Sequence, residues 1–341
     1  MTALRIHCFT SISLTYLARA RVLADTVRRH HPEWILWLLV SDEDPPKFSM
    51  ESSFDHIVRI TDLEIPGLKS WAFGHDLIEL CTAVKGAMLA RLLPDSDAVI
   101  YLDPDIALFA PLTDVMTLIT RHSIILTPHV LAPESDFESI PHNEIGTLKF
   151  GTYNLGFLAV QNSAEGARFA TWWRDRLMHF CRDDVAAGLF VDQKWCDLVP
   201  TLFNEVCILL DPGYNVASWN IGQRRIEIRD DGRILAAGHV LRFFHFTKIS
   251  TIGESALERF AYGRTEVFEL VRWYRERLSE YASPGLPNDW WAYGHYADQT
   301  LIPKSHRIAW REHNELHDKF SDPFASGPGT FQEWCATVVA G

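Results

Sequence analysis

Short apolar runs alternate with amphipathic stretches through the first two-thirds of the chain. The apolar runs predict buried strands, and the stretches with apolar residues along one side predict helices. On this pattern, strands are expected at residues 5–9, 34–40, 54–60 and 122–127, and helices at 13–30 and 77–93. Strands and helices that alternate in this way favour a mainly parallel sheet covered by helices on both faces, so we predict an α/β fold.

The pattern changes twice in the rest of the chain. A loop rich in Pro, Ser and acidic residues is expected at 132–144. After it, strands are expected at 153–160, 206–210 and 239–246, and a helix with an aromatic stripe at 164–181. From about residue 253 a charged amphipathic helix reaches residue 281, and a Pro- and Trp-rich tail follows. We therefore expect two parts, residues 1–250 and 251–341.

Residues 99–106, Val-Ile-Tyr-Leu-Asp-Pro-Asp-Ile, join a predicted buried strand to two carboxylates. Alternate residues on an extended backbone point the same way, so Asp103 and Asp105 can reach one hard cation together. The carboxyl ends of strands are where open α/β sheets bind their ligands. The segment predicts a divalent metal that holds a phosphate-bearing ligand. The alternative is a turn in which Asp-Pro-Asp simply closes the strand.

Composition and charge limit the classes of partner. The chain has 341 residues, 47% of them hydrophobic, and a net charge of −12, which argues against nucleic acid as a partner. Its six cysteines form no CxxC pair, as in a reduced cytosolic protein. No apolar run has the roughly 20 residues that cross a bilayer. We expect a cytoplasmic protein without an integral membrane segment, and peripheral contact with the inner face of a membrane stays open.

Four motifs follow one another in the chain: Tyr101-Leu102-Asp103-Pro104-Asp105-Ile106, Tyr153-Asn154-Leu155-Gly156-Phe157, Val191-Asp192-Gln193 and Phe244-His245-Phe246-Thr247-Lys248. In this order they resemble the GT-A glycosyltransferases of the galactosyltransferase and glycogenin type, the retaining family 8. The resemblance covers residues 4–250. It implies a Rossmann-like nucleotide-diphospho-sugar transferase domain over 1–250, with a mixed, mainly parallel sheet. Residues 251–341 then form a helical, aromatic-rich appendage on the acceptor side or at an interface.

The resemblance implies a metal site that binds the donor. Asp103 and Asp105 hold the metal, Asp103 also contacts the donor ribose or sugar, and His245 completes the metal shell. Imidazole and carboxylate ligands suit Mn²⁺, with Mg²⁺ as the alternative. Lys248 corresponds to a lysine that contacts the diphosphate, although Thr247 stands where the family usually has a glycine. Taken alone, His245 could equally be a core histidine at a strand end.

Three further residues correspond to the family's catalytic positions. Asn154 belongs to a segment that lies against the donor sugar and the acceptor, and Gly156 lets a ligand approach the backbone closely. Asp192 bonds sugar hydroxyls, and Gln193 lies near the reacting carbon. The alternatives are a glycine bulge in a strand at Gly156 and a helix N-cap at Asp192.

Other candidates follow from position rather than from a motif. Phe9, Thr10 and Ser11 close the first strand, where the family seats the base and ribose of its nucleotide. Lys85 lies on the helix before the acidic strand, where a basic residue faces the phosphates; the alternative is a surface lysine. Trp219 and Asn220 are candidates for the acceptor side, and Asp183 and Asp184 for a base in an inverting reaction.

The tail is dense in aromatic residues around Trp290 and Trp291, and a basic group follows. That group consists of Lys304, His306, Arg307 and Arg311. Aromatic faces stack on sugars and also anchor interfaces, and the basic group could meet an anionic lipid or polysaccharide. The alternative is a capping subdomain whose Trp residues pack on the main body.

The function expected from these features is transfer of a sugar from a nucleotide-diphospho-sugar, a UDP-sugar, to a glycan, lipid-linked or small-molecule acceptor, with retention. A non-catalytic GT-A scaffold that binds a nucleotide or a partner is the main alternative. A phosphohydrolase of the haloacid dehalogenase type carries Asp-x-Asp on an early strand with Gly-Thr or a similar turn after it, whereas Ala107 and Leu108 follow here. A sugar-nucleotide pyrophosphorylase needs a Gly-rich loop after the first strand, and residues 8–12 contain no glycine.

Overall fold

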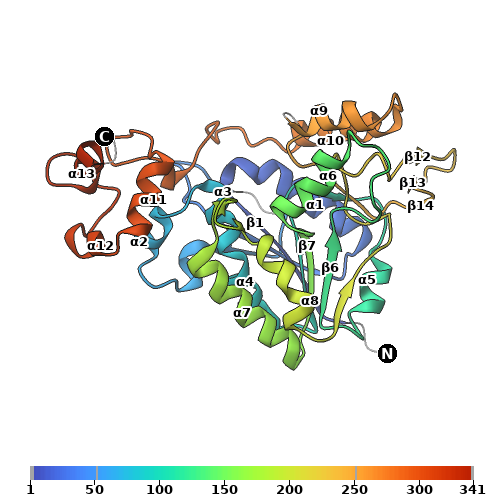
Figure 1. Ribbon diagram of the computed structural model, residues 1–341, viewed down its shortest axis with the longest axis horizontal. Coiled ribbons are helices and arrows are strands. Elements are labelled where there is room, and N and C mark those ends of the chain that lie inside the picture. Colours follow the sequence, from blue (N-terminus) through green and yellow to red (C-terminus); the bar gives the residue numbers. More distant parts are fainter. Residues whose placement is uncertain (1–3, 51–52, 250–251, 339–341) are drawn as a thin grey trace.

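The computed structural model describes residues 4–50, 53–249 and 252–338, and a seven-stranded sheet runs through its centre (Figure 1). The strands in spatial order are β10 (Val206–Ile208), β6 (Ile124–Pro128), β7 (Tyr153–Gln161), β4 (Ala98–Leu102), β1 (Ile6–Ile12), β2 (Ile35–Val40) and β3 (His56–Arg59). Strand β7 is antiparallel to both its neighbours, β4 and β6. The other neighbouring pairs are parallel. The structure confirms the mixed, mainly parallel sheet expected of a GT-A fold.

Helices cover both faces of this sheet, as the alternating pattern predicted. One face carries α2 (Leu68–Phe73), α3 (Leu77–Ala83), α4 (Lys85–Leu92), α7 (Ala164–Phe180) and the short α8 (Val199–Leu202). Its core joins Trp173 of α7 to Val99 of β4. The other face carries α1 (Leu17–His30) and α5 (Thr113–Leu118), and its core joins Val27 of α1 to Ile100 of β4. The apolar strand residues therefore alternate between two cores, as the period of a strand requires.

Several predicted boundaries are wrong in detail. The helix expected at 77–93 is two helices that meet at Val84, so that α4 begins at Lys85. The loop expected at 132–144 ends in a helix, α6 (Ile140–Phe150), which has proline in its first turn. The charged helix expected up to residue 281 is α9 (Ile252–Phe260) followed by α10 (Glu266–Glu280).

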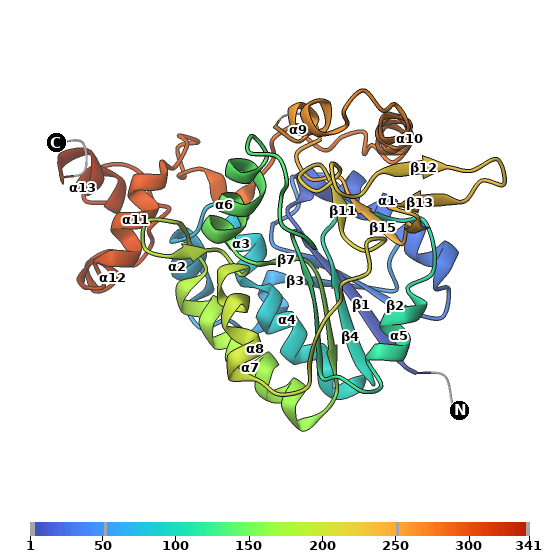
Figure 2. The same cartoon turned by 45° about the vertical axis from the view of Figure 1, so that its right-hand side comes forward.

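Smaller sheets lie beside the main one (Figure 2). The first consists of β11 (Val216–Ala217), β15 (Phe243–His245) and β5 (Ile106–Leu108). The others are the hairpin β12 (Ile226–Ile228) and β13 (Ile234–Ala236) with β14 (His239–Val240), and the pair β8 (Asp183–Asp184) and β9 (Leu189–Phe190). The strand expected at 239–246 is thus divided between β14 and β15. Because β15 pairs with β5, it brings the late His-Phe motif next to the acidic segment.

The C-terminal region packs on the main body in two places. Helix α10 shares a core with β15 and α1, in which Tyr274, Phe246 and Val22 are buried. The tail helices are α11 (Lys304–Glu312), α12 (Glu315–Lys319) and α13 (Phe331–Val338), and they gather beside α2 at one end of the molecule (Figure 1). The boundary at 250–251 lies outside the described residues, so the division into two domains stays a prediction. Among the described helices, none is long and apolar enough to cross a membrane.

The basic residues of the tail have partners within the protein, and Arg307 is too buried to meet a lipid or polysaccharide as the sequence analysis suggested. Arg307 is buried and donates to the backbone oxygens of Phe73, His75 and Tyr293. The remaining basic side chains of the group pair with protein partners as well: Arg311 with Glu79, Lys304 with Asp76, and His306 with the Tyr296 hydroxyl. The alternative of a capping subdomain describes the tail as the structure has it.

Candidate metal centre

Asp103 and Asp105 stand in the turn between β4 and β5, at the carboxyl edge of the sheet. Strand β4 ends at Leu102, and the backbone N–H of Ile106 donates to the carbonyl oxygen of Asp103 at 3.1 Å. The pair therefore lies in a tight turn, not on the extended backbone that the sequence analysis assumed. The turn does not exclude a metal site, because the side chains of Asp103 and Asp105 both face His245.

His245 reaches this turn from a distant part of the chain. Strand β15 is antiparallel to β5 and places His245 opposite Ile106, and the N–H of Phe246 donates to the carbonyl oxygen of Asp105 at 2.8 Å. The His245 Nε2 atom lies 3.0 Å from Asp105 Oδ1 and 3.6 Å from Asp103 Oδ2. The side chain of His245 is only 4% exposed and that of Asp103 is 25% exposed, so the cluster is open to solvent on the Asp103 side.

Asn154 fixes the orientation of the His245 ring. Its Oδ1 accepts from the N–H of Gly156 at 3.2 Å and lies 3.2 Å from His245 Nδ1. Its Nδ2 faces two acceptors, Gln193 Oε1 at 3.2 Å and His129 Nε2 at 3.3 Å. This arrangement leaves Nδ1 of His245 as the donor to Asn154 and directs Nε2 at the two carboxylates.

Gly156 is required by this approach of His245. A Cβ at position 156 would lie 2.6 Å from His245 Cε1 and 2.8 Å from His245 Nδ1. The glycine therefore makes room for the imidazole ring, not for a ligand as the sequence analysis proposed. The β7 motif and the β15 motif thus act together, although about ninety residues separate them.

The three residues have the chemistry and spacing of a divalent metal site. One ligand atom from each of Asp103, Asp105 and His245 lies within 4.8 Å of the others. Adjacent ligands around an octahedral ion with bonds of about 2.1 Å are roughly 3 Å apart, close to the spacing found here. Two carboxylates and an imidazole whose Nε2 faces them suit Mn²⁺ or Mg²⁺. The residues present therefore fit the metal that the sequence resemblance implies.

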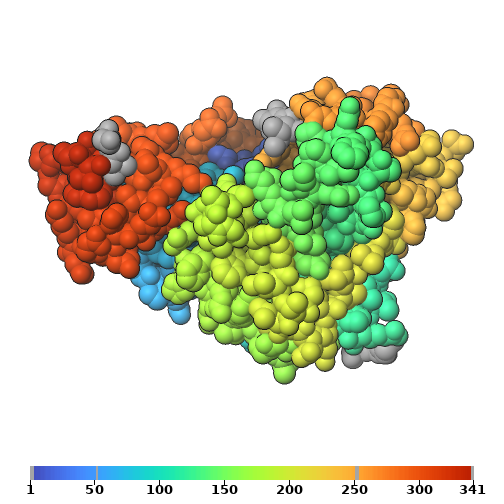
Figure 3. Space-filling model, in the orientation of Figure 1, coloured from blue at the N-terminus to red at the C-terminus, as the bar shows by residue number. Residues whose placement is uncertain are grey.

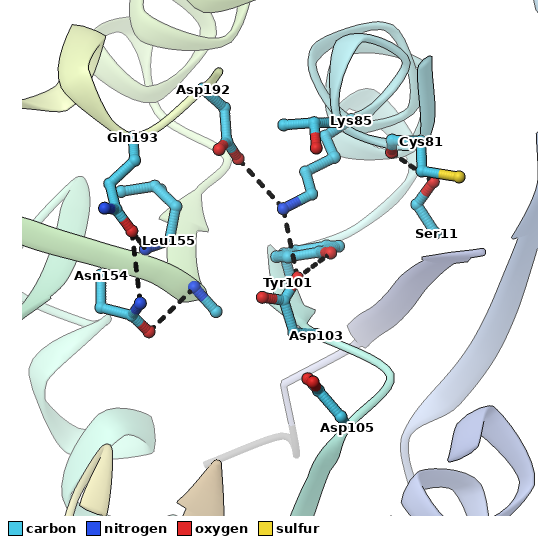
Figure 4. A network of polar contacts seen from close by, with 12 residues as sticks. Ser11, Cys81, Lys85, Tyr101, Asp103, Asp105, Asn154, Leu155, Asp192 and Gln193 are labelled. Carbon is cyan, nitrogen blue, oxygen red and sulfur yellow. Dashed lines mark hydrogen bonds and ion pairs between the residues drawn. The ribbon is translucent and has the colours of Figure 1, made fainter. Parts of the chain in front are cut away.

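A second charged group lies next to the first (Figure 4). The Lys85 Nζ atom donates to Asp103 Oδ1 at 3.2 Å and to Asp192 Oδ2 at 3.0 Å, and it lies 4.2 Å from the centre of the Tyr101 ring. The Tyr101 hydroxyl donates to Asp103. Lys85 is 6% exposed, so the alternative of a surface lysine is wrong. Gly86 allows this placement, because a Cβ there would lie 2.6 Å from Arg174 Cα in α7.

Burial and neighbouring charges shift the pKa values of this group in opposite directions. Burial raises the pKa of Asp192 to about 6, although Lys85 opposes that shift. Burial also acts to raise the pKa of Asp105, but the adjacent His245 lowers it below its usual range. Burial alone would lower the pKa of Lys85, yet Asp103 and Asp192 raise it above its ordinary value. Lys85 is therefore cationic at neutral pH.

Gln193 is occupied by protein groups. Its Oε1 accepts from Asn154 Nδ2 and from the N–H of Leu155 at 3.3 Å (Figure 4). Its Nε2 donates to the carbonyl oxygen of Phe150 at 3.0 Å. Gln193 thus ties the end of α6 to β7 and supports Asn154. Its expected place near a reacting carbon stays a prediction.

The three residues that close the first strand do not act alike. The Phe9 ring is buried against Tyr101, with ring centres 4.9 Å apart, so it belongs to the core and cannot stack on a base. Ser11 donates to the carbonyl oxygen of Cys81 at 2.7 Å. Thr10 points to the opposite face of the strand, and among the described residues its buried hydroxyl has no hydrogen-bond partner. Lys248 is exposed in a turn with a φ of 51°, and its contact with a diphosphate stays a prediction.

The sequence analysis assigned no role to Tyr101 or His129. Tyr101 precedes Asp103 by two residues, and the period of a strand could have placed both on one side. His129 follows β6 and had no motif to mark it. Burial lowers its pKa to about 4, so it is a neutral acceptor for Asn154. Trp219, proposed for the acceptor side, lies edge-on to His245 with ring centres 5.6 Å apart.

The space-filling view shows one face of the molecule recessed between the C-terminal tail and α6 (Figure 3). Residues of the N-terminal part of the chain are visible in the recess. Helix α6 adjoins the site through the bond between Gln193 and Phe150. The tail contacts the loop after β2, where Asp42 accepts from the N–H of Ala292 at 2.8 Å.

Comparison with known proteins gives relatives of moderate similarity. No family model matches the chain. Uncharacterized protein YfnF of Bacillus subtilis (strain 168) is 26% identical over 253 residues, which span 72% of this chain and 82% of YfnF. Uncharacterized protein YfnD of the same strain is 23% identical over 294 residues, which span 81% of this chain and 92% of YfnD. Among solved structures, the galactosyltransferase LgtC in complex with donor and acceptor sugar analogs is similar over 84% of this chain and 98% of LgtC, with 15% identity and a TM-score of 0.47.

Proposed function

We propose that this protein is a metal-dependent glycosyltransferase. It moves a sugar from a nucleotide-diphospho-sugar, a UDP-sugar, to a glycan, lipid-linked or small-molecule acceptor, with retention at the anomeric carbon. The observation that carries the proposal is the convergence of Asp103, Asp105 and His245 at the carboxyl edge of the sheet. The sequence motifs that supply these three residues support the same class of reaction.

The chain supplies the binding and orientation that such a transfer needs. Asp103, Asp105 and His245 would hold Mn²⁺ or Mg²⁺, whose chemistry is to stabilise the negative charge that develops on a leaving diphosphate. Asn154 keeps the Nε2 atom of His245 directed at the carboxylates. This part of the site acts on the leaving group.

A separate part of the site acts on the transferred sugar. Asp192 lies 3.0 Å from Lys85 and has a pKa of about 6, so its carboxylate is ionised at neutral pH. A fixed carboxylate beside the sugar stabilises the positive charge that develops at the anomeric carbon. Lys85 pairs with both Asp103 and Asp192, and so connects the metal centre to the part of the site that binds the sugar.

A thermal-shift panel tests this function at the level of binding. The protein is heated with UDP-, GDP-, CMP- and dTDP-sugars, each with and without Mn²⁺, because a ligand of the native state raises the melting temperature. We expect a shift that requires Mn²⁺ with one nucleotide, the uridine one. The Asp105→Ala variant should melt like the wild type without ligand and show no such shift.

Each other outcome has a defined meaning. A shift with a different nucleotide would replace UDP as the donor and leave the metal site standing. Shifts that are equal with and without Mn²⁺, or that survive Asp105→Ala, would contradict the metal site. No shift with any sugar nucleotide would contradict the function and favour a phosphohydrolase, which a phosphate-release assay would detect.

A further inference from the structure

Arg19 is a cation at the metal centre that has no role in the scheme above. It lies on α1, one helical turn before Val22, which is buried in the core that also contains Phe246 and Tyr274. Residues three apart share a helix face, so Arg19 lies on the same side but nearer the start of α1. A single 3-10 turn (Leu14–Tyr16) joins the carboxyl end of β1 to the start of α1 at Leu17, so Arg19 lies near the carboxyl edge of the sheet. Arg19 is therefore placed where a ligand of this edge would bind.

The guanidinium of Arg19 is held by an aromatic ring and not by a carboxylate. Its Cζ atom lies over the Tyr16 ring, 4.5 Å from the ring centre, which is a cation–π contact. Within residues 4–50, 53–249 and 252–338, no salt bridge involves Arg19. Lys85, by contrast, is fully used by Asp103 and Asp192. Arg19 keeps its positive charge available for a ligand.

Tyr274 approaches the same corner from α10. Its ring stacks on Phe246 with centres 4.0 Å apart and planes 3° from parallel. The N–H of Phe246 in turn donates to the carbonyl oxygen of Asp105. Tyr274 is 0% exposed, and in the described part of the chain its hydroxyl has no hydrogen-bond partner. A buried hydroxyl without a partner is uncommon in proteins, so the Tyr274 hydroxyl is a donor that can still take an acceptor.

The electrostatics agree with this geometry. Burial raises the pKa of Tyr274 above its ordinary value, and Asp105 adds to that shift while Arg19 opposes it. Burial also raises the pKa of Tyr16, with Asp105 again adding to the shift. The hydroxyls therefore stay protonated at neutral pH and can donate. An arginine and phenol donors beside a carboxylate that holds a divalent metal form a set suited to phosphate oxygens.

We propose that Arg19 and the Tyr274 hydroxyl bind the diphosphate of the nucleotide sugar on the Asp105 side of the metal centre. The inference rests on the proposed function and assigns it a binding group that no motif marks. A metal held by two carboxylates has its charge largely neutralised, and a diphosphate carries a negative charge on each phosphate. An additional cation on that side lets the site bind the diphosphate and stabilise it as it leaves.

Calorimetric titration of UDP and UMP in Mn²⁺ tests this inference with the Arg19→Met and Tyr274→Phe variants. Charged hydrogen bonds of this kind correspond to roughly a tenfold to hundredfold change in affinity. We expect Arg19→Met to weaken UDP binding by that factor and Tyr274→Phe to weaken it by about tenfold at most. The affinity for UMP, which lacks the second phosphate, should fall by a smaller factor in both variants.

The matched control is Arg29→Met, which removes the same charge from the same helix at a side chain that is 60% exposed. It should bind UDP like the wild type. If both site variants keep wild-type affinity for UDP, the inference is wrong and the proposed function stands. Equal losses for UDP and UMP would also overturn it, because the residues would then act on the nucleoside or on the fold. If the wild type binds no UDP in Mn²⁺, the proposed UDP donor fails together with the inference.

Discussion

Replacing Gly156 with alanine tests how the metal centre is assembled. The added Cβ would lie 2.6 Å from His245 Cε1 and 2.8 Å from Asn154 Oδ1. Carbon atoms in contact are normally about 3.5–4.0 Å apart, so the ring must withdraw by about 1 Å. Both residues that the methyl group meets belong to the His245 ligand arrangement. The substitution therefore acts on the metal site through packing, without changing any ligand.

A displacement of about 1 Å in the His245 ring should have a large effect on metal affinity and a modest effect on the stability of the fold. Disturbing the residues that orient a ligand typically costs about tenfold to hundredfold in metal affinity, and we expect a loss in that range for Gly156→Ala. Overpacking of a well-packed interior typically lowers the free energy of unfolding by about 1–3 kcal/mol. The variant should therefore remain folded and lose most of its Mn²⁺ binding.

Calorimetric titration with Mn²⁺, together with urea unfolding, measures both quantities. The control is Gly146→Ala in α6, where a Cβ would meet nothing within 4 Å. That variant should bind Mn²⁺ like the wild type and gain up to about 1 kcal/mol in unfolding free energy, since alanine is the better helix former. Wild-type Mn²⁺ affinity in Gly156→Ala would refute the reasoning, because His245 could then leave its position without effect.

Three further predictions follow from charges in the structure. Lys85→Met should lower donor turnover by roughly a hundredfold or more in a kinetic assay, because Asp103 and Asp192 lose the cation that they share. The control is Lys69→Met, at a side chain that is 63% exposed, which should turn over the donor like the wild type. Arg311→Ala should lower the free energy of urea unfolding by about 3 kcal/mol, because it leaves the carboxylate of Glu79, whose side chain is 1% exposed, without this partner. The control is Arg272→Ala, which breaks an exposed pair with Glu269 and should lower the same free energy by less than about 0.5 kcal/mol. An equal loss in both variants would contradict the role of burial. Burial raises the pKa of Asp42 from 3.8 to about 6, so its protonated form stabilises the fold below pH 4 and that contribution is lost as the pH rises through 6. Between pH 4 and pH 7 the free energy of unfolding of the wild type should fall by up to about 3 kcal/mol relative to that of Asp42→Asn. If the difference between the two unfolding free energies does not change with pH, the raised pKa of Asp42 is contradicted.

The sequence predicted the residues whose relation is local or carried by a motif. Asp103 and Asp105 are two positions apart, and His245 was marked by the residues around it. Lys85 was placed only by its position before the acidic strand, and the structure brings it between Asp103 and Asp192. The chemistry of the site could thus be read from short segments, because each segment supplies a whole functional group.

Other parts of the site depend on contacts between distant segments. Tyr274 reaches the Asp105 corner only because α10 packs on β15 and α1, and no pattern near residue 274 indicates this. Arg307 stands among other basic residues in the sequence, so nothing in the sequence distinguishes it from a surface cation, although the structure buries it. Phe9 was assigned to the nucleotide with Thr10 and Ser11, although β1 is buried along its whole length and Phe9 packs on Tyr101 in the core.

The most direct test of the proposed function is cleavage of the donor. Purified protein is incubated with the panel of nucleotide sugars, with and without Mn²⁺, and the release of nucleoside diphosphate and transfer of the sugar to an acceptor are followed by mass spectrometry. The proposed function predicts diphosphate release from a UDP-sugar that requires Mn²⁺ and is lost in Asp105→Ala. Binding of the donor without cleavage, or cleavage that needs neither the metal nor Asp105, would contradict it.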